Sequence, residues 1–251
     1  MARTDSAQRG GSARTRAPKR SEQMALTLIR RVVERGLAEG DKLPHEAELL
    51  EQYGVSRSSL REALRLLEVQ GMIRIRPGPG AGTEVGHATA GNLAPTLALY
   101  LLMNRITLNQ LLDAWSLVEP VLAREAALNP DRQRVARVMA EFVGGDCSCG
   151  RLMREGLNFH DAVADLSGNP VLALVLGAVG ELVTAQVMAV QHIPGAKMSD
   201  QTESAHQRIA AAILAGDGEA AEAEMHRHMV EVSAEIRAWI PRAGEPIDVR
   251  S

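Results

Sequence analysis

The sequence is poor in aromatic residues, and this scarcity limits the folds that it can adopt. Phe, Tyr and Trp together make up 2% of the 251 residues. β-Sandwiches and base-stacking nucleic-acid modules depend on aromatic side chains, so neither is expected. Only two cysteines are present, which excludes a disulfide scaffold and favours a reducing compartment, the cytoplasm. Ala, Leu, Arg and Glu are abundant and favour helix.

Charge is distributed unevenly along the chain. Residues 1–86 carry 15 basic against 11 acidic residues, whereas residues 87–251 carry 13 against 20. Residues 1–20 hold six of the basic residues and have no apolar periodicity, so they are predicted to form a disordered basic tail. The tail lacks the apolar region of a signal peptide. It either contacts phosphates nonspecifically or has no binding role.

The most apolar run covers residues 171–190 and is long enough to be considered as a membrane span. It contains Glu181 near its centre, and a carboxylate is costly inside lipid. The run is therefore predicted to be a buried helix of a bundle, and no membrane partner is expected.

The pattern between residues 21 and 87 predicts three helices followed by a hairpin. Apolar residues at helical spacing predict helices over 21–35, from near Pro44 to residue 53, and over 57–70. Ile73 and Ile75 alternate with arginines, which predicts a half-buried strand, and residues 83–85 form the returning strand after a turn rich in Pro and Gly. This order of elements is that of a winged helix-turn-helix domain.

The third of these helices has the side chains that a DNA-recognition helix needs. Short polar groups lie at its N-terminus, and arginines recur every four residues on one face. Arginine can donate two hydrogen bonds to guanine, and serine hydroxyls suit phosphate oxygens. The alternative is a solvated arginine face on an ordinary helix. The residues predicted to bind DNA are Ser56, Arg57, Ser58, Ser59, Arg61 and Arg65.

The segment LPHEAELLEQYGVSRSSLREALRLLEVQGMIRIRPGPGAGTEV resembles the DNA-binding domain of the GntR family. The resemblance covers about 65 residues and includes Gly54-Val55-Ser56-Arg57 and Arg61-Glu62-Ala63-Leu64. It implies that Gly78, in the wing, approaches the minor groove of double-stranded DNA. Ala47 stands where the family often has a DNA-contacting arginine, so the operator sequence does not transfer from the family.

Residues 92–241 are predicted to form an all-α antiparallel bundle. Helical patterns joined by short loops follow one another over 92–103, 108–128, 131–142, 151–166, 170–192, 199–215 and 219–240. Cys147 and Cys149 fall in a Gly-rich loop between two of these helices. An inert loop is favoured over a metal site or a thiol switch, because no partner residues lie nearby in the sequence.

Three histidines lie where a metal site in the bundle would need them. His160, His206 and His228 are on three different predicted helices, which a bundle can bring to one interior point. Three imidazoles suit Zn²⁺, Ni²⁺ or Fe²⁺ and leave positions for a ligand. The alternative is that they are surface residues or hydrogen-bonded core residues, with no metal.

The bundle resembles the FCD ligand-sensing domain of the FadR subfamily of GntR regulators. The resemblance rests on Phe159-His160, on Gly168-Asn169-Pro170 and on the block from His206 to Asp217. It implies that the three histidines bind metal together with an aspartate one turn before His160. Gly156 occupies that position here, so the anionic ligand is missing.

The predicted effector-binding residues are Trp115, Glu119 and Asn158. Trp115 lies four residues before Glu119, where many family members have an arginine that can meet a carboxylate effector. An indole offers a flat apolar face instead. A small carboxylate and a bulkier acyl-type effector both remain open.

These features together predict a ligand-responsive transcription regulator. The resemblance implies a repressor that binds a palindromic operator as a homodimer and is released or re-oriented by a small metabolite. The alternative is a metal-dependent enzyme that uses the three histidines, but no general base lies beside them, so an enzyme is not expected. A helical scaffold without DNA binding is a third hypothesis.

Overall fold

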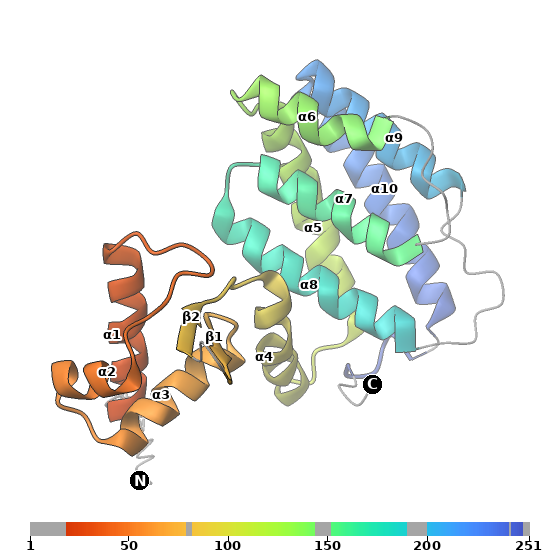
Figure 1. Cartoon of the computed structure of the whole chain (residues 1–251). Coiled ribbons are helices and arrows are strands. Elements are labelled where there is room, and N and C mark those ends of the chain that lie inside the picture. The colour runs from red at the N-terminus through yellow and green to blue at the C-terminus, as the bar shows by residue number, and fades with distance from the viewer. Residues whose placement is uncertain (1–18, 79–81, 144–151, 190–199, 241, 248–251) are drawn as a thin grey trace, which may run out of the picture. The chain divides into compact units, whose positions relative to one another are not determined.

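The computed structural model of the chain describes residues 19–78, 82–143, 152–189, 200–240 and 242–247 (Figure 1). The chain folds into two compact units that divide between Ala88 and Thr89. The first is called the head below, and the second the helical domain. The expected mainly helical fold, with one small hairpin after a helix-turn-helix, is confirmed. The predicted tail lies outside the described residues except at its end, because the first helix already begins at Arg20.

The head consists of three helices and a two-stranded antiparallel sheet. The helices are α1 (Arg20–Glu34), α2 (Glu46–Tyr53) and α3 (Arg57–Val69), and the strands are β1 (Ile73–Arg76) and β2 (Gly82–Val85). Ile73 pairs with Val85 and Arg76 with Gly82. The second helix begins two residues after the expected Pro44, with His45 at its N-cap.

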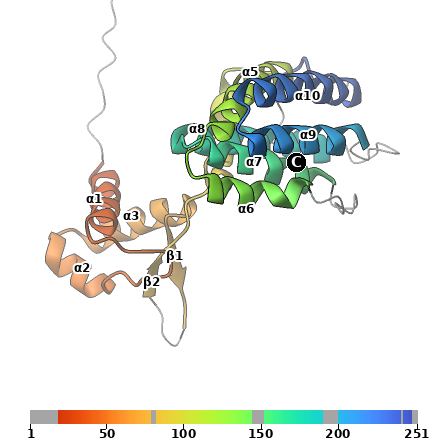
Figure 2. The same ribbon diagram turned by 90° about the horizontal axis from the view of Figure 1, so that it is seen from above.

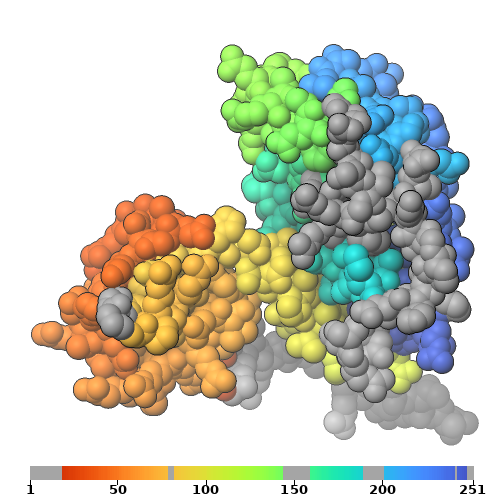
Figure 3. Space-filling model, turned by 45° about the vertical axis from the view of Figure 1, so that its right-hand side comes forward, coloured from red at the N-terminus to blue at the C-terminus, as the bar shows by residue number. Residues whose placement is uncertain are grey.

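A single hydrophobic core joins these elements of the head. Leu28 of α1, Leu49 of α2 and Leu60 of α3 are buried in it, and Figure 3 shows the head, from red to gold, packed as one body. Ile73 of β1 closes the core, but Ile75 is 42% exposed. The strand predicted from this alternation is present as β1, but its buried side is limited to Ile73, because Ile75 lies past the edge of the small core.

The turn between α2 and α3 sets the angle at which α3 leaves the head. Gly54 has φ +59°, a left-handed conformation that non-glycine residues rarely adopt. Ser56 is the N-cap of α3, and its hydroxyl accepts a hydrogen bond from the Ser59 amide. The chain can thus reverse within three residues and still start the next helix with a satisfied amide.

The described residues of the helical domain form seven helices. These are α4 (Ala90–Met103), α5 (Leu108–Ala127), α6 (Arg132–Val143), α7 (Leu152–Leu166), α8 (Pro170–Ala189), α9 (Asp200–Ala215) and α10 (Gly218–Trp239). The helix α10 packs along α5, α9 contacts both α10 and α6, and α8 packs against α4, α5 and α7. Figure 2 shows α5 and α10 on one side of the domain and α6 on the other.

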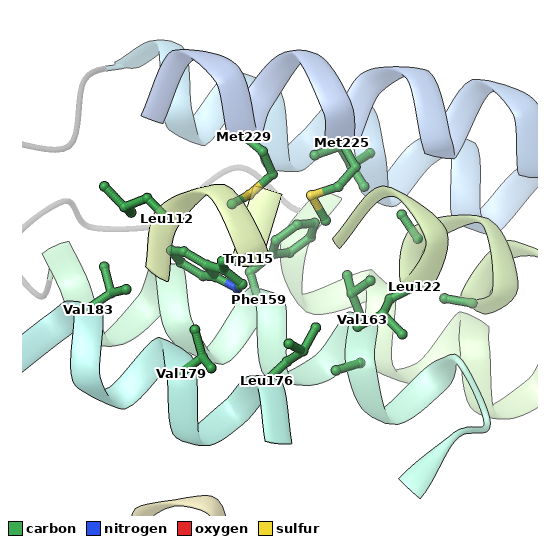
Figure 4. Close-up of a cluster of buried hydrophobic side chains, with 14 of the residues drawn as sticks. Leu112, Trp115, Leu122, Phe159, Val163, Leu176, Val179, Val183, Met225 and Met229 are labelled. Atoms are coloured by element: carbon green, nitrogen blue, oxygen red, sulfur yellow. The ribbon is translucent and has the colours of Figure 1, made fainter. Parts of the chain in front are cut away.

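The core of the helical domain lies between α5, α7, α8 and α10. Leu112 and Trp115 of α5, Phe159 of α7, and Met225 and Met229 of α10 meet there (Figure 4). The methionine side chains point from α10 toward the aromatic rings, where flexible thioethers can fill irregular gaps. This packing brings three helices that are distant in sequence, α5, α7 and α10, within side-chain reach of one another.

The helix α8 is apolar enough to have been considered as a membrane span. Its residues Pro170–Met188 have a mean hydropathy of 1.9, and 39% of the most apolar stretch is buried. It packs against three other helices of the bundle. The expected continuation of α8 to His192, like the loop with Cys147 and Cys149, lies outside the described residues.

Candidate functional site

The N-terminus of α3 presents three serines at the surface of the head. The Ser56 hydroxyl lies 3.0 Å from that of Ser58 and 2.9 Å from that of Ser59. Ser56 and Ser58 are exposed, and Ser59 is half-buried. The hydroxyls are therefore held in one cluster beside the free amides of the helix N-terminus, which is an arrangement that favours an anionic oxygen.

Arginines follow the serine cluster along the exposed side of α3. Arg57, Arg61 and Arg65 are all exposed and recur at intervals of four residues. Arg61 Nε lies 3.4 Å from the Glu46 carboxylate of α2, whereas Arg57 and Arg65 form no ion pair within the described part of the chain. The structure thus places the predicted arginines on one open face and gives one of them an acidic neighbour that the sequence pattern did not indicate.

The wing adds further positive charge to the head. Arg74 and Arg76 of β1 are exposed, and Gly78 follows them at the surface with φ +94°. Arg76 Nε donates to the buried Glu84 carboxylate at 2.7 Å, which fixes that guanidinium against β2. In the sequence, these two arginines were noted only as the polar residues of an alternating strand, and that pattern did not indicate a role in DNA binding.

In the helical domain, the three predicted histidines come together. His160 of α7, His206 of α9 and His228 of α10 are all buried. The Nε2 atom of His228 lies 3.1 Å from Nε2 of His206 and 3.3 Å from Nε2 of His160. One nitrogen from each ring lies within 4.8 Å of the others. Helices that are distant in sequence therefore converge on one point with the same ring atom.

The environment of the cluster keeps two of the imidazoles, those of His206 and His228, neutral. Burial lowers the pKa of His206 well below its usual value, and His160 and His228 lower it further. Burial, together with His160 and Arg208, lowers the pKa of His228 to about 3. A neutral imidazole is the form that binds a metal, because it has a free lone pair.

The three imidazoles also cannot meet one another's hydrogen-bonding requirements. Three Nε2 atoms that face one another cannot all donate, and Nδ1 of His228 is buried without a partner among the described residues. A buried unsatisfied polar atom costs about 1–3 kcal/mol. An ion that accepts the three Nε2 lone pairs would remove the mismatch between these nitrogens, so the donor set fits a divalent transition metal such as Zn²⁺.

Trp115 and Glu119, predicted as effector-binding residues, lie against the same cluster. Both are buried on α5, with Glu119 fully inaccessible. Trp115 Nε1 donates to Glu119 Oε1 at 2.7 Å, and Glu119 Oε2 lies 2.9 Å from Nδ1 of His160. The polar atoms of this pair are thus engaged within the protein. Asn158 belongs to the part of α7 whose side chains the structure does not describe.

A small pocket opens beside His160 and Glu119. It is too narrow in this conformation to hold a water molecule. Partial burial and Glu181 raise the pKa of Asp161, one of its lining residues. The pocket is bordered by α5, α7 and α8 and contains no lysine or arginine among the described residues: it is lined by Trp115, Glu119, His160, Asp161, Ala164, Leu176, Gly177 and Gly180.

Two contacts of the cluster were not indicated by the sequence. Phe159 stacks on His206 with 4.1 Å between ring centroids, and Glu119 contacts His160 across 41 positions of sequence. The one available signal was local: Trp115 and Glu119 are four residues apart and therefore share a helix face. That signal does not say which helix this face meets.

Family models match both parts of the chain. The model "Bacterial regulatory proteins, gntR family" matches residues 20–85, and the model "FCD domain" matches residues 110–231. The first range contains the arginine face of α3 and the wing. The second contains all three histidines together with Trp115 and Glu119.

Individual proteins match over most of the chain. The "HTH-type transcriptional regulator LutR" of Bacillus subtilis is 31% identical, over 78% of this chain and 91% of its own. The "Galactonate operon transcriptional repressor" of Escherichia coli is 28% identical, over 81% and 90%. The solved structure "Streptococcus agalactiae GntR" covers 85% of this chain and 99% of its own, with a TM-score of 0.63 and 24% identity.

Proposed function

The chain belongs to the GntR family of bacterial regulatory proteins and carries an FCD domain, and on this basis we propose that it binds a palindromic operator as a homodimer under the control of a small effector. It is a transcription regulator and not an enzyme, as its domains and relatives are. A repressor is supported by the relative named a "transcriptional repressor". The proposal includes a cytoplasmic location and no membrane partner.

The exposed face of α3 supports the proposed contact with DNA. Arg57 and Arg61 are long donors on successive turns, and a serine cluster lies at the start of the same helix. Arginine side chains discriminate bases in the major groove, while hydroxyls and helix N-termini hold phosphates. One recognition helix reads only a short half-site, which is the reason for proposing a homodimer on a palindrome.

The main support for a metal and effector site in the helical domain is the convergence of three buried Nε2 atoms. His160, His206 and His228 would hold a divalent ion, with Zn²⁺, Ni²⁺ or Fe²⁺ as candidates. When bound, such an ion supplies positive charge and open coordination positions for donor atoms of an effector. Gly156 lies one turn before His160 on α7, so that position adds no side-chain ligand.

The pocket beside the histidines supports an effector whose charge is balanced by the metal. Among the described lining residues there are two carboxylates and no lysine or arginine, so the protein itself offers little to an anion. Relatives are named for galactonate and for an L-lactate dehydrogenase operon. These names support a small carboxylate over an acyl-type effector, and the narrowness of the pocket requires side chains to move on binding.

Effector binding would act by shifting the population of dimers. A ligand changes an equilibrium only by its difference in affinity between two states. An effector that favours a dimer whose recognition helices no longer fit the operator would release the DNA. This is the expected behaviour of the proposed repressor.

The proposed metal site is tested by measuring the metal content of the purified protein by mass spectrometry. We expect about one divalent ion per chain in the wild type and a loss in His206→Gln, which removes one ligand and keeps a polar side chain. His226→Gln, on the exposed side of α10, is the matched control and should retain the ion. Protein without any ion in the wild type, after purification with no chelator, would refute the metal site.

The proposed DNA binding by α3 is tested with operator sequences that the wild-type protein selects from random DNA. Arg57→Ala should weaken binding by about 1–3 kcal/mol if the side chain reads a base. Arg137→Ala removes an equally exposed arginine from α6 and should leave affinity unchanged. Equal effects of the two substitutions in fluorescence anisotropy would contradict the assignment of α3 as the recognition helix.

A further inference from the structure

Glu119 is fully buried, and its two carboxylate oxygens face the Trp115 indole N–H and a ring nitrogen of His160. Oε1 accepts from the Trp115 indole at 2.7 Å, and Oε2 lies 2.9 Å from Nδ1 of His160. A carboxylate that accepts a hydrogen bond at both oxygens would place the proton of the Glu119–His160 contact on Nδ1 of His160. The Nε2 atom of that ring is then a free lone pair, and it is the atom that faces His228 at 3.3 Å.

From this geometry we infer that Glu119 is a positioning residue that prepares His160 to bind a metal, and that Trp115 holds Glu119 in place. The inference rests on the proposed metal site. A metal-bound histidine commonly donates its second N–H to a carboxylate, which fixes the tautomer and raises the basicity of the ligand. The described side chains that could hold the ion are three imidazoles without a carboxylate, so Glu119 brings negative charge one ring away.

The arrangement also explains why a charge is buried at this place. A carboxylate removed from water is costly unless it is hydrogen-bonded and paired. Glu119 receives a donor on each oxygen, and the Trp115 ring lies against His160 with 5.0 Å between centroids. Trp115 therefore has two contacts that align the pair, one polar with Glu119 and one of ring against ring with His160.

Substitution of Glu119 by glutamine tests its role as a hydrogen-bond acceptor for His160 without changing the volume of the side chain. Glutamine has the same shape but only one acceptor oxygen, so it cannot accept from Trp115 and His160 at opposite ends. The indole N–H can only donate, whereas Nδ1 of His160 can accept, so both partners are satisfied only with the amide oxygen toward Trp115 and the amide N–H toward His160. The proton of His160 then moves to Nε2. In Trp115→Phe/Glu119→Gln the amide oxygen is free to turn toward His160, which should restore the tautomer.

Asp161 provides a matched control for charge. Its carboxylate lines the same pocket, but it forms no hydrogen bond to a histidine ring among the described residues. Asp161→Asn therefore removes a negative charge from the pocket and leaves the acceptor of His160 intact. An effect of charge alone would appear in both variants, whereas an effect of the tautomer would appear only in Glu119→Gln.

The test combines two measurements on the full-length protein. Long-range ¹H–¹⁵N NMR of the metal-free protein should show His160 protonated on Nδ1 in the wild type and in Asp161→Asn, but altered in Glu119→Gln and restored in the double variant. Titration with Co²⁺ or Zn²⁺ should show affinity about 10–100-fold lower in Glu119→Gln. Circular dichroism verifies that each variant is folded.

The two measurements can fail separately. A wild-type protein that binds neither ion would refute the proposed metal site, while the NMR signature would still decide whether Glu119 sets the tautomer of His160. The inference is overturned if wild-type His160 carries its proton on Nε2, if Glu119→Gln leaves the ring unchanged, or if Asp161→Asn weakens metal binding as much as Glu119→Gln.

Discussion

At the scale of single residues, the chemistry of the helical domain depends on a few buried polar side chains. His160, His206, His228 and Glu119 are each at most 7% exposed in a core that is otherwise largely apolar. Buried polar groups are retained only where hydrogen bonds or function offset their desolvation. The interior of the bundle is therefore the place where stability and ligand binding oppose each other.

Acid should destabilise the metal-free helical domain because two of its histidines stay neutral when folded. The pKa of His228 is lowered to about 3 and that of His206 is also lowered, whereas both titrate near 6.5 when unfolded. Below that value the unfolded state binds more protons, so the free energy of unfolding decreases as pH falls. Between pH 7.5 and 5.5 the expected loss from His228 is about 1.4 kcal/mol, and His206 acts in the same direction.

The measurement is urea unfolding of chelator-treated protein, followed by tryptophan fluorescence. Trp115 and Trp239 both lie in the helical domain, so their emission reports that unit. His228→Gln should reduce the pH dependence, whereas His226→Gln, exposed on the same helix, should keep it. A pH dependence that both substitutions leave unaltered would show that the buried histidines do not cause it.

At the scale of elements, the head depends on close approaches of backbone that only glycine permits. Gly86 follows β2, and its amide donates to the Met72 carbonyl at 2.9 Å. A Cβ atom at Gly86 would lie 2.2 Å from the carbonyl oxygen of Gly71, which is backbone and cannot rotate away. The segment after β2 is thus pressed against the chain that enters β1, and this contact fixes the base of the wing.

Gly86→Ala should therefore destabilise the head by about 1–3 kcal/mol, the usual cost of forcing extra volume into a packed site. Gly82→Ala, at the start of β2, is the matched control because a Cβ atom there meets nothing within 4 Å. Circular dichroism during urea unfolding follows the helices of both units, whereas tryptophan fluorescence follows only the helical domain, so a transition seen by circular dichroism alone is that of the head. Equal stability of the two variants would contradict the steric explanation.

At the scale of the whole molecule, the two units have separate cores. Among the described residues, the buried core of the head runs from Met24 to Val85, and that of the helical domain begins at Leu108, with Leu97 and Leu101 packed against it. The histidine cluster belongs entirely to the second core. A ligand of that cluster should therefore stabilise the helical domain directly and leave the intrinsic stability of the head unchanged.

Zinc at about 100 times its dissociation constant should raise the free energy of unfolding of the helical domain by about 2.7 kcal/mol. The rise would appear in tryptophan fluorescence, while the unfolding of the head, detected by circular dichroism, should not shift. His206→Gln removes one ligand and should abolish the rise. A parallel shift of both units would mean that they unfold together, contrary to the separate cores.

Local patterns in the sequence predicted most of the fold. Apolar spacing in α3, proline and glycine at turns, and the Gly54–Ser56 corner are properties of neighbouring residues, so the element order followed from them. Ends of elements were less certain: Pro44 precedes α2 by two residues, and Ile75 is exposed although it continues the alternation of β1. Whether a residue is buried depends on how far the core extends, which neighbouring residues do not encode.

For this protein, the sequence by itself determined a helix-turn-helix with an arginine face, a helical bundle that follows it along the chain and three histidines as candidate ligands. Only the tertiary structure decided that the three Nε2 atoms converge, that Glu119 meets His160, and that Glu46 lies beside Arg61. Periodicity assigns a residue to a face of its own helix. Which faces meet is decided by packing between helices that are distant in sequence, and the geometry of the proposed metal site is a product of that packing.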